Sequence, residues 1–334
     1  MIPPVRSVLR TRTLRRRVVR ALLVRLAVAI GTLLLISVIT FAATNAVPAD
    51  PARVALGKEA SQADLVVYRK EQGLDKPVVE RYVHWLGNYL RGDWGKSVLA
   101  SQVSVRSEVV PRMIRTIILG AVSLTLAIAL GFLLGAWTAR RSGGPADFAV
   151  SAVTLIFNAV PEFVTALLVL VLLAVKLKAF PIESGSGILY GSVIDTVRSY
   201  VLPVLTLVLV LTPYITRMVR ANVREVLSQP LTRSSVLRGL PRRTVLWRHV
   251  VPNAALPVIS VIALTFADIL AGVVVVESVY AFPGIGKLFV DSVLGKDVPM
   301  VQAVALVVGA GFVTLNVLAD GLLVAFDPRL RSRA

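Results

Sequence analysis

The sequence contains no cysteine and only two histidines, His84 and His249. The first absence excludes disulfides, thiolate metal sites and a cysteine nucleophile. The second leaves too few imidazoles for a histidine-based metal cluster. Charge is also scarce, since charged residues make up 17% of the 334 positions and hydrophobic residues 56%. Soluble domains have about 25% and about 45–50%, so this composition indicates a membrane protein and excludes a disordered chain or a coiled coil.

Long apolar runs dominate the rest of the chain. A helix needs about 20 mostly apolar residues to cross a bilayer, and alternating barrel strands are absent. We therefore predict an all-α membrane protein with six transmembrane helices. The predicted spans are 26–49, 116–139, 148–175, 199–216, 250–276 and 301–326. A cleaved signal peptide is the alternative for the first run, but its length and the five runs that follow favour a retained helix.

The net charge of +18 is concentrated on one side of this topology. The basic N-terminal segment 1–25, the turn 140–147, the loop 217–249 and the tail 327–334 together hold 21 basic and three acidic residues. The positive-inside rule places these segments and both termini in the cytoplasm. Anionic lipid accounts for the N-terminal arginines, so nucleic acid is not expected as a partner.

The segment 50–115 on the opposite side is too long for a simple connection, and we expect a helical extracytoplasmic loop. Its sequence predicts helices over 61–72 and 78–90. The second helix repeats apolar residues at three- and four-residue steps, namely Val79, Tyr82, Val83, Leu86 and Leu90. Such a face either packs on the spans or lies in the lipid interface. Trp85, Tyr89 and Trp94 are of residue types that are enriched at that interface.

The sequence of the loop 217–249 predicts three segments: a helix that extends the fourth span, a short helix that runs crosswise, and a helix that returns to the fifth span. Pro230 stops the extension of the fourth span. Thr232 can cap a short helix that reaches Arg238 and is ended by Gly239, and 242–249 forms the return. The short helix suits insertion into a groove of a partner protein. A basic loop lying on anionic lipid is the alternative.

Two runs in and after this loop resemble a known family. They are RSSVLRGL at 233–240 and RHVVPNAALP at 248–257, and they are similar to the signature of permease subunits of ABC importers of the dipeptide, oligopeptide and nickel type. Arg-Ser-Ser stands here where Glu-Ala-Ala is typical. Further similar runs occur, in family order, at 45–51, 73–77, 85–88, 91–97, 273–277, 282–286 and 327–329.

The resemblance implies the type I importer permease architecture, with 116–326 as the permease core, in a bacterial cytoplasmic membrane. It also implies an ATPase-coupling helix formed by Arg233, Ser234, Ser235, Val236, Leu237, Arg238 and Gly239. The supporting residues of the coupling loop would be His249, Pro252, Asn253 and Pro257.

The chain has no GxxxxGK[ST] motif, so it is not expected to hydrolyse ATP or to act as an enzyme. By resemblance, ATP and Mg would bind to two partner ATPase subunits or domains. A second homologous permease would complete a heterodimer, and an extracytoplasmic binding protein would deliver the substrate. We expect no metal and no cofactor on this chain itself.

Acidic residues inside spans are costly and often functional. Glu162 and Asp268 lie within predicted spans and Glu277 lies at the outer end of one. Each either lines the translocation pathway, where a carboxylate could hold a substrate ammonium, or has a structural hydrogen-bond partner.

We expect the substrate to be a dipeptide or oligopeptide, with nickel or another small solute as the alternative. A carrier driven by an ion gradient is a more remote alternative, since no internal repeat is visible. A membrane-embedded enzyme or sensor lacks any catalytic set of side chains.

Overall fold

The structure is a computed structural model that describes residues 6–46, 51–56, 60–71, 73–99, 103–245, 248, 250–251, 254 and 266–326. These residues are almost entirely helical, with one isolated antiparallel bridge between Lys96 and Ser104. The chain divides into two compact units. The first consists of Met1–Arg106 and Gly295–Ala334, and the second is Ser107–Leu294.

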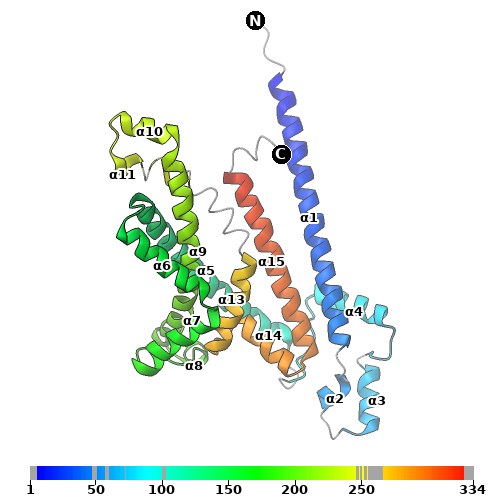
Figure 1. The fold of residues 1–334 in the computed structure, drawn as a ribbon. Coiled ribbons are helices and arrows are strands. Elements are labelled where there is room, and N and C mark those ends of the chain that lie inside the picture. The colour runs from blue at the N-terminus through cyan, green and yellow to red at the C-terminus, as the bar shows by residue number, and fades with distance from the viewer. Residues whose placement is uncertain are drawn as a thin grey trace. The chain divides into compact units, whose positions relative to one another are not determined.

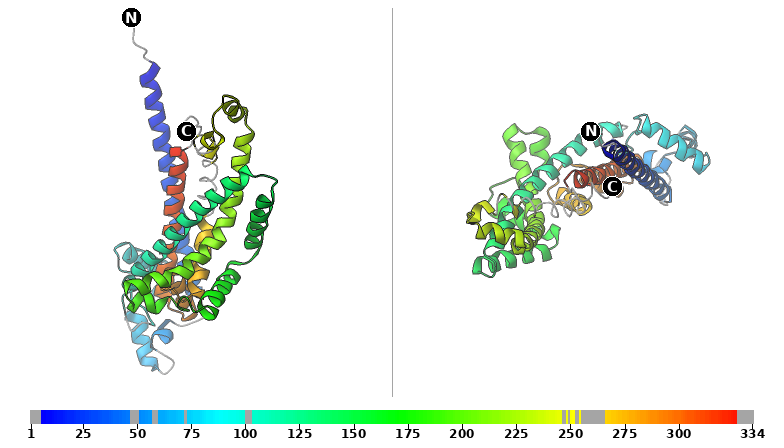
Figure 2. Two further views of the ribbon diagram at one scale, coloured as in Figure 1. Left: turned by 90° about the vertical axis from the view of Figure 1, so that its left-hand side faces the viewer. Right: turned by 90° about the horizontal axis from the view of Figure 1, so that it is seen from above.

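The first unit is built on two long helices that lie side by side, α1 (Arg6–Ala46) and α15 (Val298–Phe326) (Figures 1 and 2). A glycine allows the close approach, because a Cβ atom on Gly309 would lie 2.9 Å from Cδ1 of Ile36. Nε2 of Gln302 also donates a hydrogen bond to Oγ1 of Thr44 at 2.7 Å. Beyond Ala46 the chain forms α2 (Pro51–Leu56), α3 (Gln62–Glu71) and α4 (Val78–Leu90).

The second unit holds the remaining helices. They are α5 (Val105–Arg140, its first residues in the first unit), α6 (Pro145–Ala159), α7 (Glu162–Val169) with its π-helical continuation η1 (Leu170–Lys176), α8 (Gly185–Tyr190), α9 (Val193–Ser228), α10 (Pro230–Leu237), α11 (Arg242–Val245), α13 (Phe266–Val279) and α14 (Ile285–Leu294).

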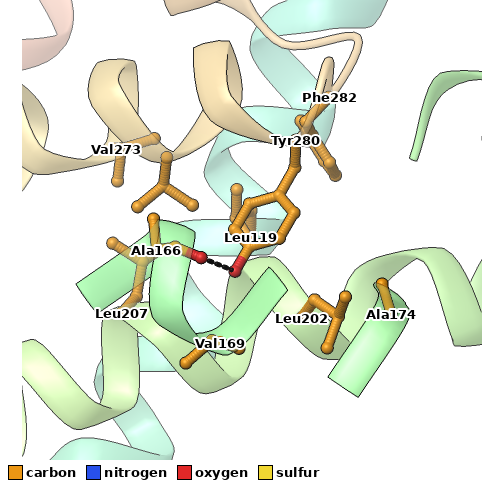
Figure 3. Close-up of a cluster of buried hydrophobic side chains, with 10 residues drawn as sticks. Leu119, Ala166, Val169, Ala174, Leu202, Leu207, Val273, Tyr280 and Phe282 are labelled. Atoms are coloured by element: carbon orange, nitrogen blue, oxygen red, sulfur yellow. Dashed lines mark hydrogen bonds between the residues drawn. The ribbon is translucent and has the colours of Figure 1, made fainter. Parts of the chain in front are cut away.

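Tyr280 is the centre of one core of this unit (Figure 3). Its ring is 1% exposed and packs among side chains from α5, α7, α9 and α13. Its hydroxyl donates to the carbonyl oxygen of Ala166 at 2.9 Å and lies 2.8 Å from the hydroxyl of Thr206. A buried polar atom is tolerated when it is hydrogen-bonded, so this residue ties three helices together.

Two glycines one helical turn apart bring α5 against α9. A Cβ atom on Gly131 would lie 2.5 Å from Cγ2 of Ile215, and one on Gly135 would lie 2.7 Å from the carbonyl oxygen of Thr216. Small residues spaced in this way let membrane helices approach backbone to backbone.

Among the residues that the structure describes, four helices are long and apolar enough to cross a membrane, and a bent pair could count as a fifth. The four runs are Leu23–Ala46 in α1, α5, α9 and Val298–Leu318 in α15. They overlap the predicted spans 26–49, 116–139, 199–216 and 301–326, although each helix extends beyond the apolar run. The predicted span 250–276 lies partly outside the described residues, and its last part is helical in α13. The count of six therefore stays a prediction.

The third predicted span, 148–175, is not one helix. It is the bent pair Pro145–Ala159 and Glu162–Lys176, whose axes differ by 106°. Val160 is extended, with φ −81° and ψ 127°, as is usual for a residue before proline. Pro161 has no N–H with which to continue the ladder of hydrogen bonds. By contrast, Pro203 and Pro213 lie inside α9 without ending it.

Candidate functional site

The short helix α10 follows α9 through a single extended residue. Gln229 has φ −66° and ψ 144°, and Pro230 then opens α10. The predicted start at Thr232 was wrong by two residues, because the fixed φ of proline suits the first turn of a helix. Thr232 is also not the predicted cap. Its hydroxyl donates back to the carbonyl oxygen of Val226 at 2.8 Å and so fastens α10 to the end of α9.

The predicted coupling residues 233–239 form the C-terminal part of α10 and the two residues that follow it. Gly239 follows the end of the helix and has φ +82°. This is the left-handed conformation, which favours glycine at this position. Leu237 is 86% exposed and Arg238 is exposed, while Ser234 is half-buried. The side chains of Arg233, Ser235 and Val236 lie outside the described residues. The end of α10 thus presents a large apolar side chain beside a cation.

The returning segment packs against α9. Val245 of α11 is buried in one cluster with Val219 and Val223 of α9, and Val250 and Ala254 belong to the same cluster. The predicted supporting residues His249, Pro252, Asn253 and Pro257 lie outside the described residues, so their role stays a prediction.

An ion pair that the sequence reasoning missed joins α6 to α9. Arg220 donates from Nε to Oδ1 of Asp147 at 2.6 Å and from Nη2 to Oδ2 at 2.7 Å. The backbone N–H of Gly143 donates to Oδ2 at 3.0 Å. Asp147 is buried and lies before the predicted span 148–175. The guanidinium lowers the pKa of Asp147 to about 2, with the Gly143 N–H as the second cause. The only sequence signal was an acid in the first turn after a proline.

Glu277 holds the loop between α13 and α14. Its carboxylate is fully buried and accepts from the hydroxyl of Thr116, from the N–H of Gly286 at 2.7 Å and from the N–H of Lys287 at 3.1 Å. The N–H of Ile285 in turn donates to Oγ1 of Thr116 at 2.9 Å. These contacts fit the structural alternative for Glu277. A role of Glu277 in the translocation pathway stays a prediction.

Glu162 opens α7 directly after the break at Pro161. Its side chain is half-buried and lies against α13, where a Cβ atom on Gly272 would be 2.5 Å from Oε2. Asp268 lies one turn before Gly272 in the same helix, although its side chain is outside the described residues. Glu162 and Asp268, two of the three acids predicted for the pathway, therefore belong to facing helices of one unit.

Among the residues that the structure describes, no three acidic or histidine side chains come together in a way that could hold a metal ion. The expectation that this chain carries no metal or cofactor stays a prediction.

The chain matches two known family models. Residues 131–332 match the family model of the binding-protein-dependent transport system inner membrane component, and residues 18–104 match the model of the N-terminal part of such components. The two matched ranges include most of each of the two units described above.

Three relatives of nearly equal length illustrate the similarity. A probable peptide ABC transporter permease of Sinorhizobium fredii is 32% identical over 92% of this chain and 97% of its own. The oligopeptide transport system permease AppB of Bacillus subtilis has the same identity and the same two coverages. The glutathione transport system permease GsiC of Pectobacterium atrosepticum is 33% identical over 90% of this chain and 95% of its own.

Proposed function

Since this chain belongs to the binding-protein-dependent transport system inner membrane components, and is thus a multi-pass permease subunit of an ABC importer, we propose that it forms half of a pathway for peptides. In the proposed importer an extracytoplasmic binding protein delivers the peptide and a second, homologous permease completes the pathway. Two ATPase subunits hold ATP and Mg and supply the driving force. The absence of a GxxxxGK[ST] motif from this chain supports placing ATP hydrolysis on the partner subunits.

The observation that carries the coupling role is the way in which α10 is joined to α9. A single residue, Gln229, separates the two helices, and the hydrogen bond from Thr232 to Val226 fixes them to each other. A displacement of α10 is thus passed to α9. The exposed Leu237 and Arg238 are suited to a groove on an ATPase subunit, where an apolar side chain enters and a cation stays at the rim.

The proposed orientation puts both termini and the loop 217–249 in the cytoplasm. Its support is the excess of arginine over acid in these segments. The ATPase subunits are cytoplasmic in this scheme, so α10 and its partner lie on the same side of the membrane.

The support for a peptide substrate is the similarity to relatives that are named as peptide, oligopeptide and glutathione permeases. Glutathione is itself a modified tripeptide, so the three names share one chemical class. Glu162 and Asp268 are the residues proposed to face the peptide, because a carboxylate in the membrane can hold an ammonium group.

Uptake of a radiolabelled tripeptide tests the proposal in cells that lack the gene and in cells in which it is restored. We expect uptake only in the restored cells, abolished by ATP depletion and retained when an ionophore collapses the ion gradients while ATP is maintained. Uptake that follows the ion gradient would refute the ABC mechanism, and uptake of nickel but not of peptide would refute the substrate.

The coupling helix is tested separately with Leu237→Glu, against Leu240→Glu as a matched control beyond Gly239. We expect the first variant to reach the membrane in normal amount but to lose peptide-stimulated ATP hydrolysis and uptake, since a carboxylate replaces the apolar contact. Normal uptake by Leu237→Glu would contradict the proposed role of α10.

A further inference from the structure

Helix α4 is fixed to α1 at two heights. The hydroxyl of Tyr82 lies 2.8 Å from the hydroxyl of Ser37, whereas Nη2 of Arg81 donates to Oδ1 of Asn45 at 2.7 Å. Ser37 and Asn45 are eight residues apart, about 12 Å along the helix axis. Asn45 is next to the last residue of α1, and Ser37 lies inside its apolar run. Tyr82 therefore points toward the middle of the run, and Arg81 points toward its end.

The two contacts orient the whole of α4, because successive residues of a helix are rotated by about 100°. The polar side chains Glu80, His84 and Asn88 fall on the arc of Arg81. They therefore face the Asn45 end of the apolar run of α1.

An apolar stripe falls on the opposite arc, next to Tyr82. Val79, Val83 and Leu90 lie within about 40° of one another on the helix circumference. Their side chains are 74%, 63% and 77% exposed. The centre of the stripe is about 180° from Arg81 and about 80° from Tyr82 on the helix circumference, so the stripe faces away from the Asn45 end of α1 and toward the depth of Ser37.

The surface of α1 at this depth is also apolar and uncovered. Leu34, Leu35, Val38 and Ile39 are between 47% and 59% exposed. The stripe on α4 thus continues a surface that belongs to a membrane-spanning run. A groove for a soluble partner would face away from that run, as the polar arc of α4 does.

Aromatic rings complete the arrangement between the two helices. Phe41 of α1 packs on Tyr82 and Trp85 with ring centroids 5.4 Å apart in both pairs. Tyr89 stacks on Trp94 at 4.9 Å. Tyrosine and tryptophan concentrate at the boundary between hydrocarbon and water, where one edge of the ring is apolar and the other is polar.

We propose that α4 is an interfacial helix whose stripe of Val79, Val83 and Leu90 inserts into the phospholipid around the Asn45 end of α1. In this arrangement the stripe contacts phospholipid acyl chains, and the polar side chains of Glu80, His84 and Asn88 face water. A helix of this kind lies in the plane of the membrane. The hydrogen bonds to Ser37 and Asn45 hold the extracytoplasmic loop at a fixed height on the bilayer.

The absence of cysteine from the chain gives a direct test, because each introduced cysteine is unique. Single cysteines at 79, 83 and 90 are compared with matched cysteines at 80, 84 and 88. Each variant carries a nitroxide label, and the full chain is reconstituted with its co-purifying subunits in vesicles of phosphatidylethanolamine and phosphatidylglycerol. Collision rates with oxygen, which concentrates in acyl chains, and with a water-soluble nickel chelate are then measured.

We expect the ratio of oxygen to nickel collisions to be several-fold higher at 79, 83 and 90 than at 80, 84 and 88. Equal ratios in the two sets would overturn the proposal, since the stripe would then be in water. Protection of the stripe from both reagents would also overturn it, because a protein surface would then cover the helix. The test does not depend on the substrate or on the ATPase partners.

Discussion

Replacing Asp147 by alanine is the most informative perturbation of the second unit. The change removes both acceptors of the Arg220 guanidinium and the acceptor of the Gly143 N–H. It also leaves a cation whose side chain is only 28% exposed without a counter-charge. Removing one member of a buried pair costs about 3–5 kcal/mol. Because Arg220 is partly exposed, we expect a loss near the lower end, about 3 kcal/mol of unfolding free energy.

The pKa of Asp147 leads to a similar magnitude. Its fall from 3.8 to about 2 in the folded chain corresponds to about 2.5 kcal/mol in favour of the charged form. A lowered pKa means that this stabilisation is complete above about pH 4 and is lost as the pH falls toward 2. At neutral pH the full effect of the substitution should therefore be seen.

The assay is a double-mutant cycle of Asp147→Ala and Arg220→Met. The free energy of unfolding of each full-length variant is measured by titrating the folded protein with SDS. We expect the double variant to be more stable than the sum of the single losses implies, by about 2–3 kcal/mol, because neither charge is then left alone. The matched control is the pair Lys76–Glu80, whose side chains are 55% and 54% exposed and which should show at most about 0.5 kcal/mol. Coupling at Asp147 and Arg220 no larger than in this control would refute the reasoning.

Four further substitutions and one control test other parts of the second unit. Gly135→Leu should prevent α5 from packing on α9 and lower the yield of folded chain in detergent. Gly120→Leu, at a position where an added Cβ atom would meet nothing within 4 Å, should elute as the original chain does. Equal elution profiles for the two variants would contradict the close packing. Glu277→Gln should lower the thermal stability of the chain, because an amide cannot accept at both of its polar atoms as the carboxylate does; an unchanged melting temperature would argue against its structural role. Glu162→Gln and Asp268→Asn should each reduce peptide uptake with little effect on the amount of chain in the membrane, and unchanged uptake by both would exclude them from the pathway.

Local sequence signals were sufficient for much of the first unit. The helix predicted over 78–90 has those bounds in α4, and the one predicted over 61–72 is α3 to within a residue at each end. Both are delimited by residues with strong backbone preferences, namely Gly73 at φ +62° and Pro77. Preferences of this kind act over a few residues and need no knowledge of the tertiary fold.

Hydropathy alone was less informative about where helices break. The run at 148–175 is apolar enough to be predicted as one span, yet it contains a 106° bend at Pro161, while α9 passes through Pro203 and Pro213 without ending. A proline only removes one donor and restricts its predecessor, and packing decides whether the helix then continues. The ion pair of Asp147 and Arg220 could not be predicted either, because it joins positions 73 residues apart.

The composition of α9 determines where that helix can yield. Its 36 residues span about 54 Å. Its two prolines lie in the apolar part, and the 15 residues from Tyr214 to Ser228 contain neither proline nor glycine. This last section is a stiff rod of about 22 Å. A displacement of α10, which follows Ser228, should therefore not bend this last section of α9. Pro213 is the first position back from Ser228 at which the helix lacks a backbone N–H donor, so α9 should bend there before it bends anywhere nearer its end.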